Sequence, residues 1–296
     1  MSLRLEMLQV ARLAPALLGE EASRRIEDFV RSTERPEGGF GDREGKPDLY
    51  YTSFAVDALT ALRAELPSGL ISFLGSFDPA TLDLVHVCAL TRLASAISAQ
   101  AAREPVMALE PLFGRIESHR SADGGYQSEP GADTGSAYAC FLACGAYSDH
   151  HRLPQKPEGV ARCLRALEQT GGGWANDRQF RIANIASTAA ATAVYRLLRL
   201  PVPRGTEPFI RSCLHPAAGG FVPFPGAPLP DLLSTAVGLH TLDSVQAGLT
   251  YLREPCLDFI DTLWTAEGGF YGSWEDDTLD VEYTYYGLLA LGHLSL

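Results

Sequence analysis

The sequence lacks any hydrophobic run that approaches the roughly 18 apolar residues of a membrane span. Positive charge is also scarce, with 24 lysines and arginines against 36 aspartates and glutamates and a formal net charge of −12. Because nucleic acids and anionic membranes attract basic patches, this balance argues against both as partners. The first apolar stretch carries Glu6, unlike the core of a signal peptide. We therefore expect a soluble, cytoplasmic protein with no transmembrane segment and no nucleic-acid partner.

Closely spaced cysteine pairs of the Cys-x-x-Cys type are missing as well. The six cysteines lie in apolar surroundings. They are Cys88, Cys140, Cys144, Cys163, Cys213 and Cys256. A chain of 296 residues can bury a large core without disulfides, and free cysteine behaves as a small buried hydrophobe. We expect all six to be reduced core residues.

What the sequence does contain is a repeat in which two glycines precede an aromatic residue. Five copies are visible: Gly38-Gly39-Phe40, Gly124-Gly125-Tyr126, Gly172-Gly173-Trp174, Gly219-Gly220-Phe221 and Gly268-Gly269-Phe270. Their first glycines are 86, 48, 47 and 49 residues apart. Since the first interval is nearly double, we expect a degenerate copy near residues 75–95, where Asp83 opens an apolar run. The chain therefore holds six repeats of about 45–50 residues.

Each visible copy continues with an acid or amide and then an apolar run of helical period. The first of these residues is Asp48, Asp133, Asn184, Asp231 or Asp280. In four copies a threonine follows at the fourth place: Thr52, Thr188, Thr235 and Thr284. Asp or Asn before such a run is typical of a helix N-cap. The runs are apolar nearly all round, which predicts buried inner helices, and the amphipathic segments between them predict outer helices.

The two ends of this array indicate how it closes. An open stack of helix pairs needs polar capping repeats, but the chain finishes in the apolar run GLLALGHLSL. We therefore predict an all-α protein, an (α/α)6 toroid in which six inner helices stand inside a ring of six outer helices. The toroid is expected to form a single domain over residues 1–296.

This pattern resembles the repeat of the prenyltransferase β-subunit and squalene (terpenoid) cyclase superfamily. The resemblance covers about residues 30–294, and residues 38–62 are especially similar to early repeats of protein geranylgeranyltransferase β subunits. It implies a cavity along the ring axis, shaped for a hydrophobic, isoprenoid-like small molecule. It also implies a helical partner subunit as one kind of partner. Because such toroids serve several activities, the resemblance alone does not fix the reaction.

The zinc chemistry of protein prenyltransferases is not expected here. The positions that match the family's zinc ligands hold Asp231, Leu233 and Tyr283, and one carboxylate cannot replace the usual three protein ligands. Two positions that bind diphosphate in the family hold Pro225 and Pro228. We therefore expect no cofactor and no metal site; zinc is disfavoured, and nothing in the sequence supports Mg²⁺.

The cyclase branch of the superfamily uses an acidic motif at the start of one inner helix to protonate an alkene or epoxide. Its closest match is residues 280–284, which places Glu282 as the proton donor, assisted by Asp280. A buried carboxyl can keep its proton near neutral pH. The same two residues also suit a helix start, Asp280 as the N-cap and Glu282 as a first-turn acid. Both interpretations remain open at this point.

Aromatic residues gather near the starts of the predicted inner helices. Those expected to line the pocket are Tyr50, Tyr51, Trp174, Tyr283 and Tyr286. As a set their faces can hold a polyprenyl chain or a cationic intermediate, although any single ring is more typical of packing between helices. His86, His240 and His293 lie in apolar runs and are expected to be satisfied core residues.

Two hypotheses for function follow. The first is an isoprenoid-handling protein, either a proton-initiated cyclase or an atypical zinc-free prenyltransferase. The alternative is a toroid without catalysis that acts as a binding or scaffold partner. A deep apolar cavity with a carboxyl at its mouth would favour the first, and a filled centre with an apolar outer patch would favour the second.

Overall fold

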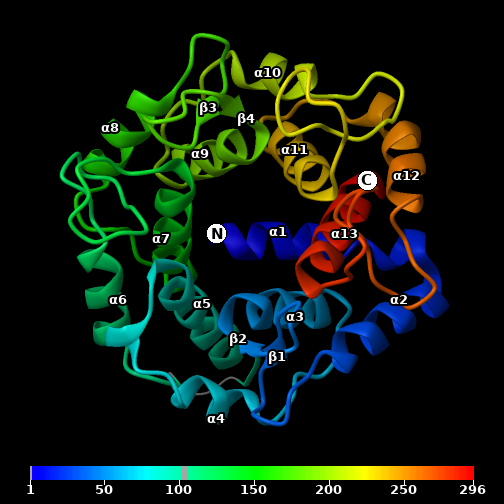
Figure 1. Cartoon of the computed structure of the whole chain (residues 1–296), viewed down its shortest axis with the longest axis horizontal. Coiled ribbons are helices and arrows are strands. Elements are labelled where there is room, and N and C mark those ends of the chain that lie inside the picture. Colours follow the sequence, from blue (N-terminus) through cyan, green and yellow to red (C-terminus); the bar gives the residue numbers. More distant parts are fainter. Residues whose placement is uncertain (1, 102–105) are drawn as a thin grey trace.

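The computed structural model describes residues 2–101 and 106–296, which form a closed ring of helices (Figure 1). The inner helices are α3 (Leu49–Ala61), α5 (Leu84–Ala101), α7 (Ala137–Asp149), α9 (Ile185–Leu197), α11 (Leu232–Ser244) and α13 (Val281–Leu294). The outer helices are α2 (Pro15–Ser32), α4 (Leu70–Gly75), α6 (Leu109–Ser118), α8 (Pro157–Leu167), α10 (Thr206–Ser212) and α12 (Arg253–Asp261). Helix α13 packs against both α11 and α3, which closes the ring. The predicted (α/α)6 toroid is confirmed.

Short elements occupy the loops between the helices. Two antiparallel strand pairs follow the double glycines of the first and fourth repeats: β1 (Phe40–Gly41) with β2 (Pro47–Asp48), and β3 (Trp174–Ala175) with β4 (Ala183–Asn184). Two 3₁₀ turns, η1 (Pro79–Thr81) and η2 (Thr250–Leu252), precede α5 and α12. None of the helices in the described residues is both long and apolar enough to cross a membrane. All six cysteines are buried and unpaired.

The repeated double glycine holds neighbouring repeats together. In each visible copy the first glycine has φ between +82° and +97° and lies against the backbone of the next outer helix or of the residue just before that helix. A Cβ there would come within 2.1–2.7 Å of that backbone, so only glycine fits. The contacts are Gly38 with Gly69, Gly124 with Gly159, Gly172 with Gly205, Gly219 with Pro255, and Gly268 with Arg25. At the degenerate copy, Arg115 of α6 instead donates to the carbonyl of Leu82 at 2.6 Å.

The repeated threonine explains the spacing between the aromatic residue and the inner helix. Its hydroxyl accepts a hydrogen bond from the backbone N–H of the aromatic residue in four copies, at 2.9 Å for Phe40 and Trp174, 3.0 Å for Phe221 and 3.4 Å for Phe270. In three of them it also donates to the carbonyl of the residue four places before it. One side chain thus joins the loop to the helix start.

The predicted N-caps hold in every visible copy except one. Asp48, Asn184, Asp231 and Asp280 each accept a hydrogen bond from a first-turn amide. In the remaining copy Asp133 was the predicted cap, but α7 begins at Ala137 and Ser136 caps it. Asp133 is exposed in the loop, nine residues after the first glycine of its copy, whereas Ser136 stands 12 residues after it, as Asn184, Asp231 and Asp280 do in their copies.

Helix α1 (Leu3–Ala11) lies across one end of the ring and belongs to neither layer (Figure 1). It packs against α3, α7 and α13. The amide of Leu3 donates to Ser148 at 3.3 Å, and Glu6 pairs with Arg196. Ser148 and Arg196 lie in the C-terminal turns of α7 and α9, so α1 closes the end of the ring where the inner helices finish.

Candidate functional site

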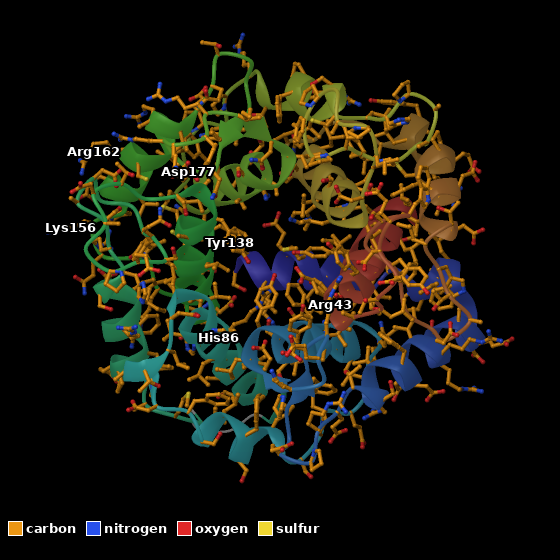
Figure 2. All side chains as sticks on the ribbon, in the orientation of Figure 1. Arg43, His86, Tyr138, Lys156, Arg162 and Asp177 are labelled. Carbon is orange, nitrogen blue, oxygen red and sulfur yellow. The ribbon has the colours of Figure 1, made fainter. Side chains whose placement is uncertain are left out.

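A cavity of about 490 Å³ lies inside the ring, between the inner helices and α1. Its walls are mainly apolar and include Phe54, Phe141, Leu142, Leu233 and Val237. We call the end where the inner helices begin the mouth, and the end covered by α1 the base. Tyr138, in the first turn of α7, lies at the inner edge of the ring (Figure 2). The volume falls within the roughly 300–1,000 Å³ of small-molecule sites.

Glu282 is the acidic group at the mouth of this cavity. It lies in the first turn of α13, lines the cavity, and accepts a hydrogen bond from the hydroxyl of Tyr50 at 2.7 Å. Burial raises the pKa of Glu282 from 4.5 to about 7; the Tyr50 hydrogen bond and Arg43 oppose the rise, and Asp280 adds to it. The carboxyl can therefore hold a proton near neutral pH and release it to a bound molecule.

Aromatic rings surround this carboxyl. Tyr50 and Phe54 meet edge to face with centroids 4.9 Å apart, and Phe54 lies 5.6 Å from Tyr286. All three residues line the cavity, together with Tyr138. Such faces attract a positive charge through the ring quadrupole, so a cation formed beside Glu282 would be stabilised.

Asp280 has a different environment from Glu282. One carboxylate oxygen accepts from the amide of Tyr283 at 2.8 Å, as an N-cap, and the other accepts from Arg43 at 2.7 Å. Arg43 also pairs with Asp276 at 2.8 Å, and Asp280 is not among the residues that line the cavity. The interactions of Asp280 are those of a residue that fixes the start of α13 and the β1–β2 loop.

The other predicted aromatic residues are placed less centrally. Tyr51 packs edge to face on Tyr50 at 5.7 Å, and Arg43 lies 5.5 Å above the ring of Tyr283; neither residue lines the cavity. Trp174 is fully buried behind the inner helices, where its Nε1 donates to the carbonyl of Leu164 at 3.0 Å. The structure therefore brings Tyr50 and Tyr286 to Glu282, but not Trp174.

His86 contributes a feature at the mouth that the sequence analysis placed in the core. Its Nε2 lies 2.9 Å from Asp48 and its Nδ1 2.8 Å from Asp83. The hydrogen bond with Asp48 raises the pKa of His86 to about 9, with a further contribution from Asp83 and against the effect of burial. His86 is thus cationic at neutral pH, as is Arg43 of the β1–β2 loop (Figure 2). The sequence contained one indication of this ion pair: Asp83 precedes His86 by three residues at the start of a helix, where the two side chains can meet.

His240 also departs from the expected core role, because it lines the cavity. Its Nδ1 lies 3.0 Å from Nε2 of His293, which is buried as expected. Burial lowers the pKa of His240 to about 4, so the ring is neutral at pH 7. Within the described residues, no three His, Cys, Asp or Glu side chains are arranged to hold a metal ion.

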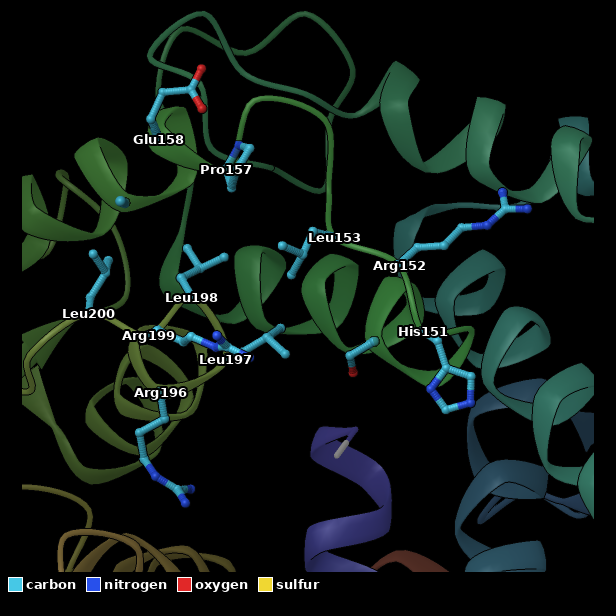
Figure 3. A pocket seen from close by; sticks show the side chains of 12 residues that line it. His151, Arg152, Leu153, Pro157, Glu158, Arg196, Leu197, Leu198, Arg199 and Leu200 are labelled. Atoms are coloured by element: carbon cyan, nitrogen blue, oxygen red, sulfur yellow. The ribbon is translucent and has the colours of Figure 1, made fainter.

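A second pocket of about 790 Å³ lies outside the inner ring, between the C-terminal ends of α7 and α9 and the start of α8 (Figure 3). Arg152 and Arg199 border its apolar floor, which includes Leu153 and Leu197. Arg196 lines both this pocket and the central cavity. We place the candidate site in the central cavity, since Glu282, whose pKa is raised to about 7, lies there.

Comparisons with known proteins agree with this architecture. The sequence matches the family described as prenyltransferase alpha-alpha toroid domain over residues 13–250 and 202–295. No curated protein sequence matches it significantly.

Among solved structures, a variant of type II terpene cyclase MstE from Scytonema, in complex with geranylgeranyl dihydroxybenzoate, is similar with a TM-score of 0.59 and 12% identity, over 99% of this chain and 98% of that one. A variant of alpha-1,6-mannanase GH76A from Salegentibacter sp. HEL1_6, in complex with alpha-1,6-mannotriose, has a TM-score of 0.64 and 12% identity, over 93% and 98%. A protein from Actinoplanes has a TM-score of 0.58 and 15% identity, over 93% and 98%. At these identities the likeness shows the fold alone.

Proposed function

Because this chain belongs to the prenyltransferase alpha-alpha toroid domain family, we propose that it binds an elongated isoprenoid-like molecule in the central cavity and that Glu282 protonates it to begin a cyclisation. The observation that carries the proposal is one carboxyl, with a pKa of about 7, held by Tyr50 at the mouth of an apolar cavity. The apolar walls suit a hydrocarbon chain better than a sugar, although glycosidases share the fold.

The proposed reaction begins when the O–H bond of Glu282 breaks and its proton forms a C–H bond with a terminal alkene carbon. The neighbouring carbon becomes cationic, and the next double bond attacks it to form a C–C bond. Loss of a proton from an adjacent carbon restores an alkene, so the product is an isomer of the substrate. Neutral His240 in the same cavity can accept that proton, while solvent reprotonates Glu282.

The aromatic rings around Glu282 are proposed to stabilise the cation that forms after proton transfer. The positive charge exists only after proton transfer, so the faces of Phe54 and Tyr286 stabilise the intermediate more than the neutral substrate. Arg43 ties Asp280 to the loop at the mouth and thereby holds the helix turn that carries Glu282. Asp280 is thus proposed as a positioning residue, and Glu282 as the catalytic acid.

The experiment is incubation of the full chain with squalene, geranylgeraniol or geranylgeranyl diphosphate in D₂O, followed by mass spectrometry. We expect a cyclised product that carries one deuterium for each initiating protonation. Glu282→Gln should abolish this product while retaining substrate binding in a thermal-shift assay. Glu275→Gln, which changes an exposed acid in the loop before α13, is the matched control. Product formation by Glu282→Gln would refute the assignment.

A binding or scaffold role is the second candidate, and one surface feature favours it. Phe180 and Ile182, in the loop between β3 and β4, are 67% and 61% exposed, as expected for residues that contact another protein. This role predicts that Phe180→Ser with Ile182→Ser abolishes association with a partner and leaves ligand binding in the cavity unchanged. Deuterium incorporation into a product would show catalysis regardless of that outcome.

A further inference from the structure

The base of the cavity is polar, in contrast to its walls. Side chains from five helices meet there: Arg4 from α1, Asp57 from α3, Arg92 from α5, Asp149 from α7 and Tyr285 from α13. Four of them, all except Asp57, line the cavity. The electrostatic environment of Tyr285 includes all four of the others, so the five groups form one cluster, which we call the base cluster.

The ion pairs of the base cluster are unevenly shared. One oxygen of Asp57 lies 2.6 Å from Nε of Arg4, and the other lies 3.0 Å from Nη2 of Arg92. A single carboxylate is therefore shared by two guanidinium groups. Asp149 forms no ion pair within the described residues. Burial raises the pKa of Asp149, and Arg92, Arg4 and a hydrogen bond with Ser2 oppose the rise.

Hydrogen bonding in the base cluster is incomplete as well. Nε of Arg92, Oδ1 of Asp149 and the hydroxyl of Tyr285 are buried and lack a partner in the described part of the chain. A buried charge that is only partly paired is costly, and so is each unmet donor. The side chain of Arg92 keeps 22% of its surface exposed, and since Arg92 lines the cavity, this surface is available to a molecule bound there.

We propose that the base cluster is a binding site for the carboxylate end group of the cavity's ligand, held chiefly by Arg92. The ligand is then an isoprenoid acid whose charged end lies at the base and whose chain runs through the apolar part toward Glu282. A monoanion matches the one positive charge that Asp57 leaves unpaired, whereas a diphosphate brings more negative charge than the cluster can neutralise.

Tyr286 lies in the part of the cavity wall that both Arg92 and Glu282 influence. Tyr286 lies close enough to both Glu282 and Arg92 for each to act on its hydroxyl: after burial, Glu282 raises the pKa of Tyr286 and Arg92 lowers it. Arg92, Tyr286 and Glu282 all line the cavity, so a ligand that fills it can meet both charged groups. This inference rests on the part of the proposed function that places the ligand in the central cavity, and does not require Glu282 to be an acid catalyst.

The test compares farnesoic acid with its methyl ester, which keeps the chain but removes the charge. Isothermal titration calorimetry on the full chain at pH 7.5 should show that the acid binds about 10- to 100-fold more tightly, the effect of one charge-assisted hydrogen bond. Arg92→Met should remove this preference. Arg204→Met, which removes an exposed arginine before α10, should keep it.

Equal affinity of the wild-type chain for the acid and the ester would overturn the inference, as would failure of the acid to bind. The wild-type comparison needs no variant, so the inference remains testable even if Arg92→Met does not fold. An unchanged preference in folded Arg92→Met would also overturn it. A preferred acid without any cyclised product would refute the proposed catalysis alone, and conversion of squalene without a preference for the acid would refute this inference alone.

Discussion

Replacing Glu282 by Gln tests the environment of this carboxyl without any knowledge of the substrate. In the folded chain burial raises its pKa to about 7, whereas the reference value is 4.5. Between these two pH values the unfolded chain has lost the proton and the folded chain keeps it. Glu282 therefore makes the wild-type protein less stable as the pH rises from 4.5 to 7, and above pH 7 its effect is constant. Glutamine cannot ionise, so the variant escapes this loss.

The size of the effect follows from the same two values. The difference between 4.5 and about 7 corresponds to about 3 kcal/mol of unfolding free energy. The stability of Glu282→Gln relative to the wild type should therefore increase by about 3 kcal/mol between pH 4.5 and pH 8. Titrating groups that do not interact with Glu282 cancel in this difference, because both proteins contain them.

Urea unfolding, followed by the fluorescence of the three tryptophans, measures this difference at several pH values. Glu275→Gln is the matched control, because it removes an exposed negative charge from the adjoining loop. A relative stability that stays flat from pH 4.5 to pH 8 would show that Glu282 titrates as it does in water. In that case the argument for a protonated acid in the cavity fails.

Three further predictions address the site and the repeat. Tyr50→Phe removes a hydrogen bond that favours the ionised form of Glu282, so the pH above which relative stability levels off should move upward in the same urea titration; a downward move would contradict this. Gly172 has φ +91°, and a Cβ there would lie 2.4 Å from a backbone oxygen, so Gly172→Ala should lower the free energy of unfolding by about 2 kcal/mol or more. Gly171 has open space around it, so Gly171→Ala should lower it by less than about 1 kcal/mol. Equal thermal unfolding midpoints for the two variants would be inconsistent with the contact. Thr235→Val leaves the buried amide of Phe221 without its hydrogen bond and should lower the free energy of unfolding by about 1–3 kcal/mol. An unchanged free energy of unfolding would show that this bond between loop and helix does not stabilise the fold.

The ring could be predicted from the sequence because its determinants are local and repeated. Each double glycine marks a contact between repeats, and each threonine marks a loop joined to its helix. Helix α1 carries neither signal, so its position across the ring could not be inferred. The wrong N-cap in the third repeat has a different cause: Asp133 suits a cap by residue type, but only Ser136 stands 12 residues after the first glycine, the spacing of the caps Asn184, Asp231 and Asp280.

The site was predictable only in part. Glu282 and Tyr50 were found because both lie in first turns of inner helices, which converge at one end of a ring. Trp174 lies beside a helix start as well, but its side chain points into the layer between helices, a direction that the repeat pattern does not reveal. The base cluster had one signal, the charged residue Asp57 inside an otherwise apolar helix, but its partners Arg4 and Arg92 come from distant segments.

The contact between Gly268 and Arg25 joins the last repeat to the first outer helix in the same way that the other glycines join consecutive repeats. Every repeat of the toroid therefore has a neighbour on both sides, and none is a terminal repeat from which unfolding could start. Circular permutants that open the chain in a loop between repeats should keep every one of these contacts. Excision of a whole repeat would instead leave a gap in the circumference, and we expect such a deletion to abolish folding rather than yield a smaller ring.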